Sequence, residues 1–203
     1  MLKVALTGGI ATGKSHVGKV LEELGCHLIQ ADALGHQALL PDGEAYAPVV
    51  AIFGEAILGK DRKIDRRKLA ALVFDDTARL EQLNAIVHPA VERLRQAATG
   101  QIVERDPHPI VVVEAAIHIE TGGYRNYGKL ILVVCSEEEQ IRRAMLRDNV
   151  SEAEVLARIR RQMPLGDKRK FADYVIDSSG SFESTRRQTE AVYNLLRSLE
   201  SSL

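Results

Sequence analysis

The feature that most constrains this chain is a glycine-rich octapeptide near its first residue. Residues 8–15 read GGIATGKS and match the pattern G-x-x-x-x-G-K-[ST]. An apolar run precedes the octapeptide at residues 2–6, and a helical pattern follows it at residues 14–24, with apolar side chains spaced along one helix face. Strand, glycine loop and helix in this order are typical of a phosphate-binding loop, so a merely flexible glycine turn is a poor alternative.

Each residue type in this loop has a role in holding phosphate. Glycines let the chain turn so that successive backbone N–H groups point at phosphate oxygens, and the helix N-terminus adds its dipole. We therefore expect ATP as the nucleotide, with Lys14 supplying a positive charge and Ser15 holding Mg²⁺. The expected nucleotide-binding residues in and beside the loop are Gly8, Gly9, Ala11, Thr12, Gly13, Lys14, Ser15 and His16.

The rest of the chain alternates short apolar runs with helical patterns. Strands are expected at residues 2–6, 27–30, 110–116, 130–135 and 174–177. Helices are expected between and after them, at residues 14–24, 137–147 and 182–199. The runs at 110–116 and 130–135 are β-branched and continuously apolar, as buried parallel strands are. This alternation predicts an α/β fold with a doubly wound, five-stranded parallel sheet of the P-loop kinase type.

Two segments stand outside this alternation. Residues 32–106 are expected to form a helical lobe that binds the acceptor, the molecule to which phosphate is transferred. Its helices are expected to be broken near Pro41, Pro48, Gly54, Gly59 and Pro89. Residues 140–170 contain nine Lys or Arg against four Asp or Glu, and we expect them to form a basic helical lid. For any single cation of this segment, a solvated helix face is the alternative. Because no repeat or low-complexity linker is present, residues 1–203 are expected to form one domain with two lobes.

The composition argues against several kinds of partner. The 203 residues carry a formal net charge of -1, and aromatic residues make up only 4% with no Trp, so nucleic acid is not an expected ligand. No apolar stretch has the length of a signal sequence or a membrane span, and we expect a cytoplasmic protein. Cys26 and Cys135 lie in apolar stretches without paired spacing and are expected to be small core residues. The oligomeric state is left open.

Asp32 is the leading candidate for the group that orients the acceptor hydroxyl or receives its proton. It follows the short second strand, where small-molecule kinases with this loop place the acceptor lobe, and a carboxylate there can accept a proton. A helix N-cap is its alternative role, and the two roles are compatible. Residues 32–35 also match the DxxG string of regulatory GTPases, but the guanine-reading NKxD string is absent, so we treat this match as accidental.

Several separate motifs in the chain belong to one pattern. They are LTGGI at residues 6–10, Asp32, Arg66 with Leu69, NAIVHP at residues 84–89, Glu114, Glu120, Gln140 with Arg143 and Arg147, ARI at residues 157–159 with Gln162, and ADYVID at residues 172–177. Together they resemble the bacterial dephospho-CoA kinase family, from about residue 4 to about residue 180.

This resemblance implies a kinase that transfers phosphate from ATP to the ribose 3′-hydroxyl of dephospho-coenzyme A. The products are coenzyme A and ADP, in the last step of coenzyme A biosynthesis, and Mg²⁺ is the implied metal. The catalytic residues it implies are Lys14, Asp32 and Arg143, and Arg147 is implied to contact ATP. The acceptor-binding residues it implies are Asp32, Arg66, His88, Pro89 and Glu120. The expected partners are therefore the two small-molecule substrates, with no nucleic acid and no membrane.

Two other functions stay open beside this one. The first is a kinase for another small metabolite or a nucleoside monophosphate, which would share the loop and the lid. The second is a non-catalytic module that binds ATP. The chain also departs from the family pattern, since His16 stands where Thr or Ser is usual and Gln30 replaces a frequent Asp. Ala116 and His118 likewise replace a common Pro and Leu.

Three local expectations complete the predicted site. His88 precedes Pro89, which predicts a helix boundary with Pro89 in the first turn of the next helix. Arg143 and Arg147 lie at i,i+4, where like charges destabilise a helix unless they share an anion such as the transferring phosphate. Glu114 is expected to contact Mg²⁺ through water, with a structural carboxylate as the alternative.

Overall fold

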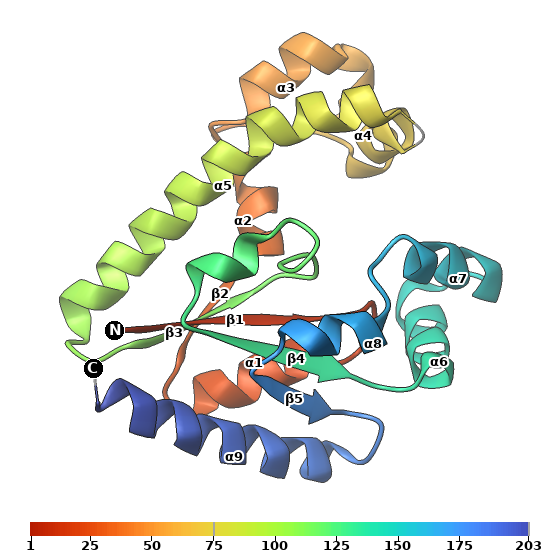
Figure 1. Ribbon diagram of the computed structural model, residues 1–203. Helices are drawn as coiled ribbons and strands as arrows, with labels where there is room; N and C mark the ends of the chain where they lie inside the picture. The colour runs from red at the N-terminus through yellow and green to blue at the C-terminus, as the bar shows by residue number, and fades with distance from the viewer. Residues whose placement is uncertain (75, 203) are drawn as a thin grey trace. The chain divides into compact units, whose positions relative to one another are not determined.

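The sheet that carries the phosphate loop has five parallel strands. The computed structural model describes residues 1–74 and 76–202. The strands are β1 (Leu2–Gly8), β2 (His27–Gln30), β3 (Ile110–Glu114), β4 (Lys129–Val134) and β5 (Tyr174–Asp177), and they lie in the order β2-β3-β1-β4-β5 (Figure 1). The predicted α/β fold with a five-stranded parallel sheet is therefore confirmed.

Helices connect the strands and form most of the segment between β2 and β3. They are α1 (Lys14–Glu23), α2 (Ala31–Ala38), α3 (Tyr46–Phe53), α4 (Arg66–Val73), α5 (Thr77–Arg105), α6 (Glu137–Asp148), α7 (Glu152–Arg160), α8 (Leu165–Lys168) and α9 (Phe182–Glu200). The chain divides into two compact units. We call residues Met1–Gln30 with Ile102–Leu203 the sheet unit, and residues Ala31–Gln101 the helical unit.

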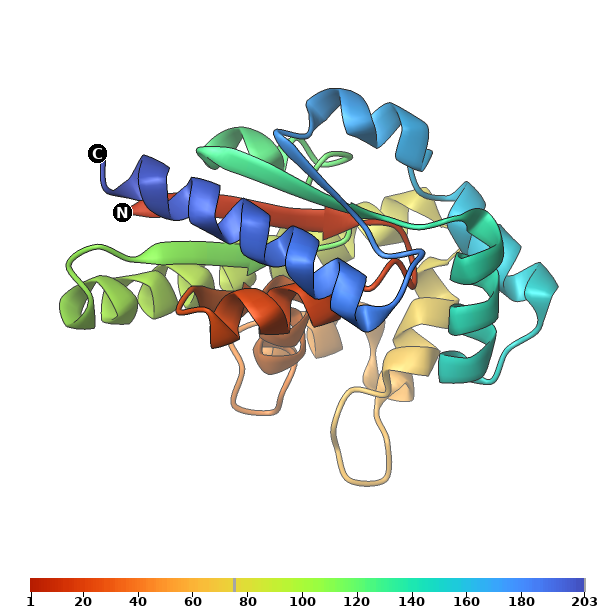
Figure 2. The ribbon, with the colours of Figure 1, turned by 90° about the horizontal axis from the view of Figure 1, so that it is seen from below.

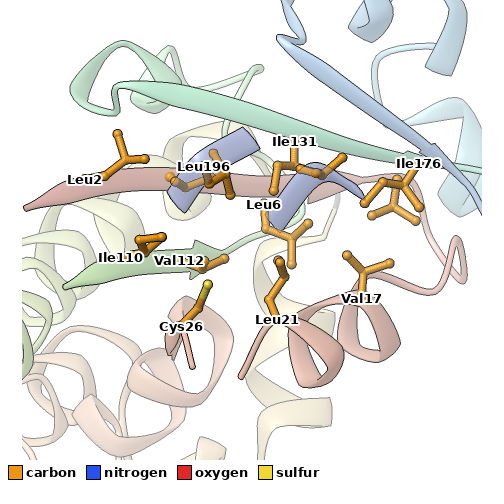
Figure 3. Packing of buried hydrophobic residues seen from close by; sticks show 13 residues of the cluster. Leu2, Leu6, Val17, Leu21, Cys26, Ile110, Val112, Ile131, Ile176 and Leu196 are labelled. Carbon is orange, nitrogen blue, oxygen red and sulfur yellow. The ribbon is translucent and has the colours of Figure 1, made fainter. Parts of the chain in front are cut away.

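The three central strands, β1, β3 and β4, are buried on both faces, which explains their continuous apolar runs. On one face they pack against α1 and α9, which lie side by side in Figure 2, and Figure 3 shows Leu6, Leu21 and Leu196 in this core. On the other face, Ala5 packs in a second cluster with Ile119, from the segment that follows β3. Each large side chain buried in this way contributes about 1.5–3 kcal/mol to folding.

Both cysteines are core residues, as expected. Cys26 is 4% exposed and Cys135 is 8% exposed, and neither forms a disulfide. Burial raises the pKa of Cys26 to about 12, and burial also raises the pKa of Cys135. Both thiols therefore stay protonated at neutral pH and behave as apolar side chains.

The carboxyl ends of all five strands share one edge of the sheet, because the strands are parallel. At this edge β1 runs into the phosphate loop, β2 ends at Gln30 and β3 ends at Glu114, while Ser136 and Ser178 follow β4 and β5. The chain goes from β1 to β2 and β3 on one side, and then to β4 and β5 on the other. Ligands of open α/β sheets bind at such a switch point, so the loop lies where the fold favours binding.

The predicted helix boundary at His88 and Pro89 is wrong, because α5 runs from Thr77 to Arg105 through both residues. A proline inside a helix removes one hydrogen bond, here the bond to the carbonyl of Ala85. Ala85, His88 and Pro89 are exposed, so water can satisfy that carbonyl. The opposite side of α5 packs into the core of the helical unit with helical spacing across the proline, through Leu83, Ile86, Val87, Ala90, Val91 and Leu94. Packing before and after Pro89 therefore keeps the helix continuous.

The other predicted interruptions of the helical unit fall at or beside helix ends. α2 ends at Ala38, shortly before Pro41, and Gly54 directly follows α3. Gly59 lies between the short 3-10 turn η1 (Glu55–Ile57) and α4, and Pro48 lies in the first turn of α3, where proline is tolerated. In the part of the chain that the structure describes, no helix has both the length and the apolarity of a membrane span.

Gly8 offers a test of how closely the phosphate loop packs on the sheet. A Cβ at this position would lie 2.5 Å from the carbonyl oxygen of Val133 and 2.5 Å from Oγ1 of Thr12. Val133 belongs to β4, which pairs with β1, so it cannot move away freely. We expect Gly8→Ala to lower the free energy of unfolding by about 1–3 kcal/mol.

Gly100→Ala is the matched control, because Gly100 lies within α5 and a Cβ there meets nothing within 4 Å. This substitution is expected to raise the free energy of unfolding by about 1 kcal/mol. Denaturant unfolding of both variants measures the two effects. A Gly8→Ala variant as stable as the wild type would contradict the close packing of the loop.

Candidate active site

The backbone of the phosphate loop has the conformation of an anion-binding nest. Ala11 and Gly13 have φ angles of 53° and 83°, in the left-handed region that turns successive N–H groups towards one point. For Ala11 this conformation costs about 1 kcal/mol, so the surrounding contacts must hold it. Two of those contacts converge on the carbonyl oxygen of Gly9, to which Thr12 Oγ1 donates at 3.0 Å and Lys14 Nζ donates at 2.8 Å.

The helix that follows the loop leaves its first turn open to an anion. α1 begins at Lys14, directly after Gly13, which has no side chain to cap it. The first N–H groups of a helix have no intrahelical acceptor and carry a partial positive charge. With the left-handed loop before them, these N–H groups give the loop the geometry that an anion such as phosphate requires.

Ser15 is placed to hold a cation. Its hydroxyl donates to Oε1 of Glu114 at 2.9 Å, and Gln30 Nε2 donates to Oε2 of Glu114 at 3.2 Å. Glu114 is 8% exposed, so these two bonds compensate for the lost hydration of its carboxylate. Because the hydrogen of Ser15 is committed to Glu114, the lone pairs of the hydroxyl oxygen remain for a metal. A carboxylate in place of Gln30 would instead put a second negative charge against Glu114.

This donor set fits Mg²⁺. Proteins hold Mg²⁺ with few oxygen ligands and leave its other positions to phosphate and water. Ser15 Oγ, oriented by Glu114 behind it, supplies one such ligand. Within residues 1–74 and 76–202, no group of three or more His, Cys, Asp or Glu side chains could hold a metal ion.

Two cavities flank the phosphate loop within the sheet unit. On the side of Gly13, a cavity of about 430 Å³ is lined by His16, Arg143, Ser178, Gly180 and Phe182, among others. On the side of Gly9, a cavity of about 490 Å³ is lined by Gln140, Ile159, Gln162 and Leu165, among others. Both fall within the usual volume of small-molecule sites, about 300–1,000 Å³.

His16 lies on α1 and forms part of the wall of the Gly13-side cavity. Its ring makes an edge contact with Phe182, with 4.9 Å between the ring centroids. Its Nε2 atom is buried and has no hydrogen-bond partner among the described residues. The residue that departs from the family pattern therefore borders the loop, as the sequence predicts, and replaces a small hydroxyl with an aromatic wall.

The two predicted arginines of α6 have different surroundings. Arg143 donates to Glu139 at 2.8 Å and to the side chain and carbonyl of Ser178 at 3.1 and 2.7 Å, which holds its guanidinium beside Gly13. Arg147 is more exposed, and its hydrogen bonds to Asp148 raise its pKa. Each arginine thus has its own carboxylate partner, and their i,i+4 spacing does not by itself require a shared anion.

The cations of residues 140–170 are mostly paired with carboxylates of the chain. Ion pairs are formed, among others, by Arg142, Arg143, Arg147, Arg158, Lys168 and Lys170. Lys168 is fully buried, and its Nζ lies 2.8 Å from Oε1 of Glu120 and donates to the carbonyl of Ala116 at 3.1 Å. The same Glu120 carboxylate accepts the N–H of Met163 at 3.2 Å. Glu120 therefore has structural partners that the resemblance did not imply.

The remaining predicted residues belong to the helical unit. Asp32 lies inside the first turn of α2, which begins at Ala31, so the N-cap alternative does not describe it. One turn further on, partial burial and the charge of Arg66 lower the pKa of His36, and Asp32 opposes them. Asp32, His36 and Arg66 are thus close enough to interact. His88 and Pro89 lie on the exposed side of α5.

Sequence reasoning missed several residues of this region. The sequence motifs give no role to His36, although its i,i+4 relation to Asp32 on one helix is a usable signal. The hydrogen bond from Ser15 to Glu114 joins residues 99 positions apart, and no local pattern indicates it. Gln140 and Gln162 were noted only as parts of motifs, yet both contact the backbone of the phosphate loop.

Comparison with known proteins assigns the family. A family model described as dephospho-CoA kinase matches residues 2–184. The chain belongs to the dephospho-CoA kinase family. The resemblance inferred from the sequence motifs is therefore confirmed.

Individual relatives agree with this assignment over nearly the whole chain. The dephospho-CoA kinase of Syntrophus aciditrophicus is 40% identical over 97% of this chain and 83% of its own length. The crystal structure of TT1252 from Thermus thermophilus has a TM-score of 0.83 and 37% identity, covering 96% of this chain and 97% of that one. A dephospho-CoA kinase structure from Campylobacter jejuni has a TM-score of 0.61 and 27% identity, covering 95% of each chain.

The pair formed by Glu120 and Lys168 generates a stability prediction. Removing the charge of Glu120 leaves the buried Lys168 ammonium without its carboxylate, so Glu120→Gln should lower the free energy of unfolding by about 3 kcal/mol. Lys168→Met should cost less, because Glu120 is 22% exposed and water can reach it. Denaturant unfolding of the two variants measures this asymmetry.

The pH dependence gives an independent check of the same pair. Partial burial opposes ionisation of Glu120, but the hydrogen bonds from Lys168 and from backbone N–H groups prevail and hold its pKa below the ordinary 4.5. Its contribution to stability is present above pH 4.5 and is lost as the pH falls through the lowered pKa. The wild type should therefore lose more stability on acidification than Glu120→Gln does. Parallel stability curves would show that the pair contributes nothing.

Proposed function

We propose that this chain transfers the γ-phosphate of ATP to the ribose 3′-hydroxyl of dephospho-coenzyme A. The observation that carries the proposal is the phosphate loop in its anion-binding form, with Ser15 oriented by Glu114, in a member of the dephospho-CoA kinase family. The products would be coenzyme A and ADP.

The loop and α1 would hold the phosphates of ATP. Backbone N–H groups from Ala11 to Gly13 and the first turn of α1 would bind the β- and γ-phosphates, with Lys14 as the positive charge. Lys14 already lies along the loop, with its Nζ donating to the carbonyl of Gly9, so its side chain would need little rearrangement to reach a bound phosphate. The cavity beside Gly13 and His16 would take the ribose and base, with Arg143 at its edge.

Mg²⁺, when bound, would neutralise charge that develops on the transferring phosphate. Ser15 Oγ would be its protein ligand, and Glu114 would keep the hydroxyl turned towards it. Arg143 would add positive charge on the nucleotide, and Arg147, now paired with Asp148, would contact ATP by exchanging that carboxylate for phosphate.

The helical unit would supply the acceptor site. Asp32 would accept a hydrogen bond from the 3′-hydroxyl and, late in the transfer, its proton. Arg66, whose charge acts on the same His36 as Asp32 does, would bind an anionic group of dephospho-coenzyme A. His88 and Pro89 are assigned to acceptor binding from the family motif. Glu120 is likewise assigned to acceptor binding from the family motif alone, and its carboxylate pairs with Lys168 within the sheet unit.

The setting in which the protein works is part of the same proposal. We infer that it acts in the cytoplasm on small molecules, ATP and dephospho-coenzyme A, without nucleic acid or membrane partners. The near-neutral formal net charge of -1 and the scarcity of aromatic residues support this inference.

The function is tested by measuring ADP release across a panel of acceptors. The panel contains dephospho-coenzyme A, nucleoside monophosphates, shikimate and gluconate, each with MgATP. We expect turnover with dephospho-coenzyme A alone. Turnover with another member of the panel instead would replace the proposed acceptor, and ATP binding without turnover would indicate a non-catalytic module.

Lys14→Ala is expected to abolish most of this turnover while the protein stays folded. The loss should be at least about a hundredfold, because Lys14 would stabilise charge in a site from which water is excluded. Lys19→Ala is the matched control, since Lys19 is an exposed lysine of the same helix. Turnover and thermal unfolding are measured for both variants. Equal turnover in the two would refute the role of the phosphate loop.

Asp32 allows a separate test of the acceptor site. Asp32→Asn keeps the size and one hydrogen-bonding oxygen but cannot take a proton, so a general base predicts a loss of about 10²- to 10⁴-fold in kcat with little change in acceptor affinity. Asp32→Ala should lose orientation as well. The measurements are kcat, the Kd for dephospho-coenzyme A and the unfolding midpoint.

The control for charge is Asp42→Asn, because Asp42 is an exposed carboxylate of the same unit. If Asp32 only interacts with the dipole of α2, its substitution should cost about 0.3–1 kcal/mol of stability and leave kcat unchanged. A near-normal kcat in Asp32→Asn would defeat the assignment.

A further inference from the structure

One residue of the phosphate loop is held by two glutamine side chains from distant parts of the chain. The N–H of Ile10 donates to Oε1 of Gln162 at 2.9 Å. The carbonyl of Ile10 accepts from Nε2 of Gln140 at 2.7 Å. Both hydrogen-bonding groups of this peptide residue are therefore occupied by side-chain amides, and all three residues belong to the sheet unit.

Gln140 contacts the backbone of the phosphate loop directly. It lies on α6, is 4% exposed, and lines the cavity on the Gly9 side. A Cβ placed on Gly9 would come within 2.5 Å of its Nε2 atom. The glycine at position 9 thus lets a buried amide reach the backbone of Ile10. A buried amide is costly without hydrogen bonds, so this contact explains how Gln140 is tolerated in the interior.

Gln162 lies in a segment that other contacts hold in place. It lies between α7 and α8, and the next residue, Met163, donates its N–H to Glu120. At the end of α8 the buried Lys168 pairs with the same carboxylate. The acceptor oxygen that Gln162 offers to Ile10 is therefore held by a second set of contacts a few residues further along.

Holding Ile10 determines where the next N–H groups point. Ala11 follows it in the left-handed conformation, and Gly13 repeats that conformation two residues later. Among the described residues, no acceptor is found for the N–H groups of Ala11, Thr12 and Gly13. The Ile10 N–H is thus occupied by Gln162, and the N–H groups of Ala11, Thr12 and Gly13 are available to bind a phosphate.

We propose that Gln140 and Gln162 are positioning residues that hold the phosphate loop in its nucleotide-binding conformation. They act on the loop by fixing both polar groups of Ile10 and make no contact with the reacting atoms. Gln162 additionally makes the order of the loop depend on the segment from α7 to α8, through Glu120 and Lys168. The expected effect on MgADP binding rests on the proposed function, whereas the expected effect on hydrogen exchange at Ile10 does not.

The experiment measures amide hydrogen exchange at Ile10 and the Kd for MgADP in the full-length protein. Gln162→Met removes the acceptor and keeps the length of the side chain, so exchange at Ile10 should accelerate and MgADP should bind more weakly, each by about three- to tenfold. Gln162→Glu keeps an acceptor oxygen, so exchange at Ile10 should stay near the wild-type rate. Gln140→Met removes the donor and should weaken MgADP binding to a similar extent.

Gln188→Met is the matched control for losing a two-bond amide contact. Gln188 accepts the N–H of Asp177 at 2.9 Å and donates to the carbonyl of Asp177 at 2.8 Å. It therefore bonds both backbone groups of one residue, as Gln140 and Gln162 together do for Ile10. This variant should lower the unfolding temperature without changing exchange at Ile10. If the buried Gln140→Met variant does not fold, the two Gln162 variants still decide the question.

The outcomes test the positioning role of Gln140 and Gln162 separately from the proposed function. If Gln162→Met lowers only the unfolding temperature, with Ile10 exchange and MgADP affinity at wild-type values, Gln162 is merely structural and the inference is wrong. Equal acceleration in Gln162→Met and Gln162→Glu would also overturn it, because the acceptor would then be irrelevant. If the exchange pattern is as expected but the wild type releases no ADP with dephospho-coenzyme A, the positioning role stands and the proposed function fails.

Discussion

The conformation of the phosphate loop depends on the close packing of its backbone at the end of β1. At Gly8 the chain passes so near the carbonyl of Val133 that no side chain fits, and at Gly9 it passes equally near the amide of Gln140. Ala11 is then held in the left-handed region although it is not a glycine. Without these contacts Ala11 would relax, because nothing local favours the left-handed conformation in a residue with a side chain. The orientation of Lys14 and Ser15 follows from the same loop, since both lie in the helical turn that it leads into.

Elements with a local signature were predictable from the sequence. The strands carry continuous apolar runs because both faces of the sheet are covered, and the loop motif combines residue types that only a phosphate site requires. Pro89 shows where local reasoning fails. A single missing hydrogen bond was outweighed by apolar packing on both sides of the proline, which depends on residues of the helical unit far away in sequence.

The contacts that shape the site were not predictable, because they join residues far apart. Ser15 meets Glu114, Ile10 meets Gln162, and Lys168 meets Glu120, and no periodicity relates these positions. Charge counting likewise does not show which cations already have partners. The excess of cations in residues 140–170 predicts a basic lid, and most of these cations have carboxylate partners within the chain. A nucleotide would have to exchange with such partners, so its binding would release one set of charge-assisted bonds to form another.

The contact between Gly9 and Gln140 also has an evolutionary consequence. A side chain at position 9 would collide with the amide at position 140, and a shorter side chain at position 140 would lose its bond to Ile10. The effect of a substitution at position 9 therefore depends on whether the side chain at position 140 can move aside, and moving it aside puts its bond to Ile10 at risk. Such dependence is epistasis, in which the effect of one mutation is set by the state of another site. The second glycine of the octapeptide is then restricted by a partner residue 131 positions away, a restriction that the loop motif alone does not reveal.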